Sequence, residues 1–171
     1  MRTTKKLALS ALLAALSAVI LFLGSALELI DLSAAAVATL FVSFTLFELG
    51  TGFAALLWAV TSVASLLLFP SGASAFYMAI GLYPLLKTQL EKLLPIWEWA
   101  LKMLSANAIL AVYVVMGKFV LMLPDEIFSG WLLWAFLALA NLCFVLFDVA
   151  LSRLLTVYTL RWRPRFARFL K

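Results

Sequence analysis

The sequence predicts an all-α polytopic membrane protein, a six-transmembrane-helix bundle in a single domain over residues 1–171, and three observations agree on this. First, 67% of the residues are apolar and only 12% are charged, which leaves too little polar surface for a domain in water. Second, residues 7–27, 49–86 and 127–147 carry no charged side chain, and about 20 apolar residues suffice for a helix to cross a bilayer. Third, these runs are continuous, which favours helices over the alternating strands of a barrel.

Turn signals divide the apolar sequence into separate spans. Glu28 and Asp31 follow the first apolar run, and Pro70 and Gly72 interrupt the long charge-free stretch, because neither proline nor glycine continues a helix well. Pro124 lies in a polar turn before the last run. We therefore predict six spans, at about 7–27, 32–47, 53–69, 73–86, 103–122 and 127–157.

The basic residues predict the orientation of the bundle. Lysine and arginine gather in residues 2–6, 87–102 and 161–171, and such residues are retained on the cytoplasmic side of a membrane. All three clusters lie on one side only if the number of spans is even. The sequence thus predicts a multi-pass protein of a bacterial cytoplasmic membrane with both termini in the cytoplasm.

The polar connection after the fourth span predicts an amphipathic helix at about 88–102 that lies in the cytoplasmic membrane interface. Its apolar residues, four leucines and Trp97, recur mainly at steps of three and four, and Trp97 and Trp99 suit the headgroup level. Pro95 should bend or divide this helix. Two interpretations remain open, a linker that follows the membrane surface and a docking surface for a cytoplasmic partner.

Composition argues against several classes of function. The chain has no histidine, the commonest general base and metal ligand, and it has no glycine-rich phosphate loop. We therefore expect no enzymatic activity, no cofactor and no metal site. The net charge of +5 is the sum of the topology signals and gives no continuous basic face for nucleic acid. A single cysteine, Cys143, excludes an internal disulfide.

Polar residues inside the spans are the candidates for function, because polar groups at membrane depth usually face a cavity or a partner. Lys118, near the outer end of the fifth span, is either a snorkelling lysine paired with Asp125 or Glu126, or an anchor for an anionic ligand group. Asp148, near the inner end of the sixth span, has Lys87, Lys102 and Arg153 at its own depth. We favour a structural ion pair there over a proton relay.

One stripe of the sixth span predicts a ligand pocket. Trp131, Trp134 and Asn141 follow one another at helical spacing, so the tryptophans can wall an outward-facing pocket whose floor is Asn141. The alternatives are an interfacial aromatic belt for the tryptophans and a bridge between two helices for Asn141. Tyr77 in the fourth span is a further candidate for the pocket.

The first span carries a face of small residues. Ala11 and Ala15 form a small-xxx-small pair, and Ala8 extends it by one turn. Such faces allow the close backbone approach by which helices pack in lipid. The sequence leaves open whether the opposing helix belongs to this chain or to another.

The basic start, the Ala11-x-x-x-Ala15 helix, six spans in under 200 residues and a basic tail together resemble the S components of energy-coupling factor (ECF) transporters. The resemblance implies a membrane-embedded substrate-binding subunit for uptake of a vitamin or precursor. It also implies contact of Ala11 and Ala15 with a transmembrane coupling subunit driven by two ATPases, and a pocket compatible with Lys118, Trp131, Trp134 and Asn141. Few polar residues are present to line a vitamin site, so the ligand is expected to be apolar or isoprenoid-like.

A second interpretation is a membrane scaffold without a ligand, similar in topology to the rod-shape-determining MreD group. In that case the alanine face and the 88–102 segment would hold partners. A ligand-binding protein should concentrate polar groups in the outer half of spans four to six, whereas a scaffold has no such requirement.

Overall fold

The computed structural model describes residues 3–27, 30–91, 95–119 and 130–162, and over these residues the chain is helical without a strand. Five helices in this part of the chain are long and apolar enough to cross a membrane. An all-α fold with several helices long and apolar enough to cross a membrane is thereby confirmed, whereas the count of six stays a prediction. The elements are α1 Thr3–Leu27, α2 Asp31–Leu49, α3 Thr51–Leu68, α4 Gly72–Ile80, α5 Tyr83–Leu90, α6 Pro95–Phe119, α7 Trp131–Val157 and the π-helical turn η2 Tyr158–Trp162.

Helix α2 forms the centre of the bundle. It is the most buried of the five candidate spans, and it packs against α1, α3 and α4. Its buried positions are mostly small, and the hydroxyl of Thr39 donates to the carbonyl of Ala35 within the helix. Small residues and internally satisfied hydroxyls let neighbouring helices approach closely in an apolar medium. A single residue, Gly50 with φ of +100°, joins α2 to α3, a conformation that glycine adopts easily.

Helix α1 packs on this centre through one narrow face. Its buried residues recur at steps of three and four, and a Cβ added at Gly24 would lie 2.5 Å from the Cβ of Ala34 in α2. Glycine is therefore required for this contact between the two backbones. The face consists of Ser10, Leu13, Ser17, Leu21 and Gly24.

The predicted fourth span, 73–86, is divided into α4 and α5 by a turn at residues 81–82. Pro84 lies in the first turn of α5 and has no N–H to continue the hydrogen bonding of α4. The indole of Trp58 in α3 donates to the carbonyl of Met78 at 3.1 Å, so a side chain satisfies a backbone group beside the break. Such compensation is what permits an interrupted helix within a membrane.

Residues 88–102 do not form a separate element in the described part of the chain. Residues 88–90 end α5, and residues from Pro95 onward begin the long helix α6, since proline is well tolerated in the first turn of a helix. Trp97 and Trp99 are exposed there. The interfacial helix predicted over 88–102 is thus not confirmed.

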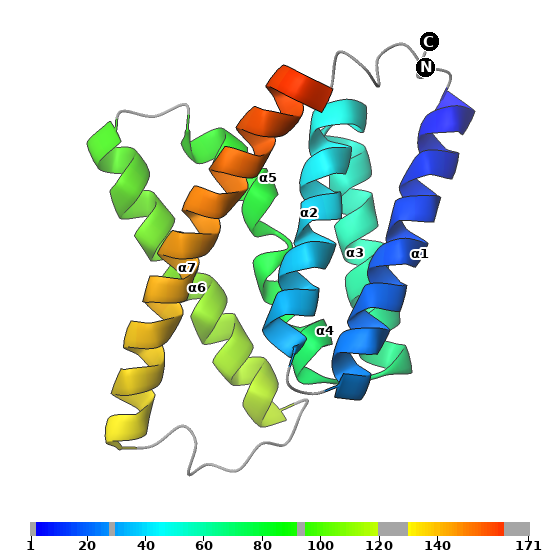
Figure 1. The fold of residues 1–171 in the computed structure, drawn as a ribbon. Helices are drawn as coiled ribbons and strands as arrows, with labels where there is room; N and C mark the ends of the chain where they lie inside the picture. The colour runs from blue at the N-terminus through cyan, green and yellow to red at the C-terminus, as the bar shows by residue number, and fades with distance from the viewer. Residues whose placement is uncertain (1–2, 28–29, 92–94, 120–129, 163–171) are drawn as a thin grey trace.

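Figure 1 shows how the helices alternate in direction. Helices α1, α3 and α6 run one way, and α2, α7 and the α4–α5 pair run the other way. The start of α1 and the end of η2 therefore lie at the same end of the bundle, together with the start of α6. Helix α7 crosses α6, and large apolar side chains of both helices remain exposed.

Candidate functional site

A cavity of about 330 Å³ lies where α2, α4, α6 and α7 meet. Ligand pockets commonly range from about 300 to 1,000 Å³, so this volume suits a small molecule. The cavity is partly open, and along α7 it extends from Phe136 to Phe147, which is about 16 Å at 1.5 Å rise per residue. Among the residues that the structure describes in its wall, none is charged.

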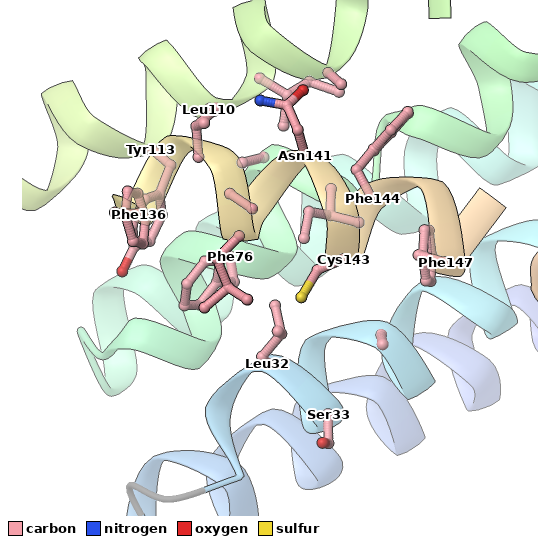
Figure 2. Close-up of a pocket in the computed structure, with 17 residues that line it drawn as sticks. Leu32, Ser33, Phe76, Leu110, Tyr113, Phe136, Asn141, Cys143, Phe144 and Phe147 are labelled. Carbon is pink, nitrogen blue, oxygen red and sulfur yellow. The ribbon is translucent and has the colours of Figure 1, made fainter. Parts of the chain in front are cut away.

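Aromatic rings form much of the wall. Figure 2 shows Phe76, Tyr113 and Phe136 gathered at one end, and Phe144 and Phe147 toward the other. The rings of Phe76 and Tyr113 are stacked with centroids 4.0 Å apart, an arrangement that stabilises aromatic pairs beyond their burial. The thiol of Cys143 lies between these two groups and points into the cavity.

Asn141 lines the cavity, but its amide is turned toward α6 (Figure 2). It forms a reciprocal pair with Asn107 of α6, with both nitrogen-to-oxygen distances at 3.2 Å. Each amide also donates to the carbonyl four residues earlier, Met103 for Asn107 and Leu137 for Asn141, at 2.9 Å. All four amide N–H groups are thereby used. Of the two interpretations of Asn141, this geometry favours the bridge between helices.

Three of the other predicted pocket residues, Trp131, Trp134 and Tyr77, do not join Asn141 in the cavity wall. Trp131 and Trp134 are 77% and 73% exposed, as expected for side chains at a lipid or headgroup level. Tyr77 is fully buried in the core against α2, and it is not part of the cavity wall. Lys118 lies near the end of α6, and its side chain, like Asp125 and Glu126, falls outside the described residues.

The small-residue face of α1 is not covered by the part of the chain that the structure describes. Ala8, Ala11 and Ala15 are exposed, because α1 packs through the different face that contains Leu13 and Ser17. The sequence leaves open whether the helix that packs on this face belongs to this chain or to another, and the structure bears on the first possibility. Within the described residues, no helix of this chain covers the alanine pair.

A charged cluster joins α5, α6 and α7 beyond the cavity. Asp148 of α7 is 3% exposed and pairs with Lys87 of α5, while its second carboxylate oxygen lies 3.2 Å from the ammonium of Lys102 of α6. Glu91 completes a ring of alternating charges, at 3.2 Å from Lys87 and 3.8 Å from Lys102. The predicted pairing of Asp148 with Lys87 and Lys102 is confirmed, whereas Arg153 is exposed.

Two hydroxyl groups and a further carboxylate complete the coordination of this cluster. The hydroxyl of Tyr83 donates to Asp148 at 2.6 Å, the ammonium of Lys87 donates to the hydroxyl of Ser152 at 2.8 Å, and Glu98 lies 2.7 Å from Lys102. Buried charges are tolerated when they are paired and hydrogen-bonded in this way. A polar hollow opens beside the cluster and includes Glu91, Glu98, Asp148 and Arg153 in its wall.

Asn107 and Tyr83 were not assigned to a site from the sequence. For Asn107 the sequence signal was misleading, since it lies only five residues into the predicted fifth span, 103–122, whereas Asn141 lies near the middle of the sixth. Helix α6 begins earlier, at Pro95, and Asn107 is then at the centre of its helix, where an amide commonly bonds across to a neighbouring helix. For Tyr83 no comparable signal exists, because tyrosine hydroxyls occur at many depths.

The comparisons with known proteins give no match: no protein-family model, no curated protein and no solved structure is similar to this chain. The function therefore has to be argued from the cavity and the helix faces themselves.

Proposed function

We propose that this chain is the membrane-embedded binding subunit of a small-molecule uptake system, similar in role to the S component of an ECF transporter. The observation that carries the proposal is the aromatic-lined cavity between α2, α4, α6 and α7. A rigid scaffold has no need of a partly open hollow of this size, because helices in lipid gain stability from close packing.

The ligand of this subunit is uncharged and predominantly apolar, such as a prenyl compound or an aromatic vitamin precursor. The described residues of the cavity wall offer no charged group, and the amide N–H groups of Asn141 are already bonded. A charged ligand would lose its hydration without compensation there. An apolar ligand instead gains free energy from burial of its surface.

The topology in this proposal has six crossings, with α4 and α5 together acting as an interrupted fourth crossing. The common location of the α1 start and the η2 end in Figure 1 supports an even number. The exposed Ala11 and Ala15 then provide the face for a transmembrane coupling subunit. Both chain ends and the charged cluster belong to the cytoplasmic side.

We expect apolar ligands to raise the thermal stability of the purified protein. Detergent-solubilised protein would be heated with a panel of prenyl compounds, vitamins and nucleobases, and a ligand at 100 times its dissociation constant stabilises by about 2.7 kcal/mol. Ala140→Phe, which places a ring in the cavity wall, should abolish the shift. Leu67→Phe on the exposed surface of α3 is the matched control and should retain it.

An absence of any shift across the panel would contradict the proposal and favour the scaffold interpretation. A shift that persists in Ala140→Phe would show that the ligand binds elsewhere.

A further inference from the structure

Two hollows follow one another along α7. The apolar cavity reaches Phe144 and Phe147, and the wall of the polar hollow begins with the next residue, Asp148. The apolar cavity lies among membrane-crossing helices, whereas the polar hollow is lined by charged side chains and lies at the end where α6 begins. Phe147 of the first wall and Asp148 of the second are consecutive residues, and the side chains around them form the layer between the two hollows.

Tyr83 forms the centre of that layer. Its ring meets Phe144 edge to face with centroids 4.7 Å apart and lies 6.3 Å from the ring of Phe147. Its hydroxyl donates to Asp148 at 2.6 Å. A single fully buried side chain thus touches the wall of the apolar cavity with its ring and the wall of the polar hollow with its oxygen.

The ring of charges holds this side chain in place. Asp148 accepts from Tyr83 while it is fixed by Lys87 and Lys102 from two other helices. Tyr83 lies in the first turn of α5, directly after the break from α4. A change in angle between α4 and α5 therefore moves the tyrosine relative to α7, because chain breaks of this kind are where helices turn about one another.

We propose that Tyr83 closes a passage from the apolar cavity to the polar hollow, and that a ligand leaves the membrane interior by this passage. The ligand's use of the passage rests on the function proposed above. The closure itself does not, because it is a property of the residues between the two hollows. Tyr83 is a positioning residue here, and Asp148 is the group that holds it closed.

The passage can be tested without any ligand, because Cys143 is the only cysteine of the chain and lies in the cavity wall. The full-length protein would be reconstituted in vesicles and exposed to an anionic, membrane-impermeant methanethiosulfonate on the side that faces the start of α6. A Thr3→Cys marker in a Cys143→Ser background identifies that side, since α1 begins at the same end.

We expect Tyr83→Ala to raise the rate of Cys143 modification from that side at least tenfold over the unsubstituted protein. Tyr83→Phe should raise it by an intermediate factor, because the ring still fills the space against Phe144 but is no longer held there by Asp148. Phe147→Ala, which opens the same layer without touching a charged group, should act like Tyr83→Ala. Phe136→Ala, which enlarges the far end of the cavity, is the control and should leave the rate unchanged.

Equal rates in the unsubstituted protein, in Tyr83→Ala and in Phe147→Ala would overturn the proposal, as would an equal increase in Phe136→Ala. Thermal unfolding of each variant shows which variants are folded. If Tyr83→Ala is unfolded, the rate of Cys143 modification in Phe147→Ala decides the outcome. Failure of ligand binding in the thermal assay leaves this result unaffected, so the two proposals fail separately.

Discussion

Asp148→Asn is expected to lower the free energy of unfolding by about 3–5 kcal/mol, the range for removal of one partner from a buried ion pair. Asp148 accepts from Tyr83 and neutralises Lys87 and Lys102, which are 2% and 3% exposed. Asparagine keeps the size but removes the charge. Among the described residues, the two ammonium groups then keep only Glu91 and Glu98 as carboxylate partners, and the packing of α5, α6 and α7 against one another is weakened. Thermal or denaturant unfolding of the protein in detergent measures the change.

Two matched variants separate charge pairing from simple disruption. Glu91→Gln removes a carboxylate that is largely exposed and should change stability by less than about 1 kcal/mol. The double variant Lys87→Met/Asp148→Leu replaces a buried pair by apolar groups and should be more stable than the sum of its single changes predicts. An Asp148→Asn protein as stable as Glu91→Gln would show that ion pairing by Asp148 does not stabilise the packing of α5, α6 and α7.

Ala11→Trp and Ala15→Trp should each abolish co-purification of a transmembrane coupling subunit and its ATPases, while the chain itself remains folded. Both positions are exposed on α1, away from the face that contacts α2, so an indole there meets no residue of the bundle core. It does prevent the close backbone approach that a small-residue face provides. Affinity purification from native membranes, together with thermal unfolding of the variant, measures both effects.

Leu67→Trp is the control for this experiment, since Leu67 is 78% exposed on α3 and lies far from the alanine pair in sequence. It should leave assembly intact. If Ala11→Trp and Ala15→Trp retain the coupling subunit, the role of the first helix that the family resemblance implies is wrong.

The helices themselves could be predicted because the apolar runs are long and free of charge. The partners of Asp148 could also be predicted, since the rise of a helix places Lys87 and Lys102 at the same depth, and burial of an unpaired carboxylate in lipid is too costly to persist. In both cases the alternative structure, an unsatisfied backbone or an unpaired charge in lipid, costs so much free energy that the sequence pattern is sufficient to predict the observed one.

The cavity could not be predicted in the same way. Its wall consists mainly of phenylalanine, leucine, isoleucine and alanine side chains that look identical in sequence to residues facing lipid, and only the placement of α6 and α7 beside α2 and α4 turns them inward. The break before Tyr83 had a signal in Pro84, but a proline can also be accommodated as a kink in a continuous span. The positions of the α7 tryptophans, Trp131 and Trp134, are also ambiguous in sequence, because the same helical spacing suits an aromatic belt and a pocket wall.

Protection of Cys143 tests the binding cavity most directly. The thiol of Cys143 points into the apolar cavity (Figure 2). The rate of its modification by a small membrane-permeant maleimide should therefore fall at least tenfold when an apolar ligand from the thermal panel is bound. The same ligand should give no protection in Ala140→Phe. If the bound ligand leaves the modification rate unchanged, the ligand does not occupy the cavity between α2, α4, α6 and α7, and the functional account is wrong.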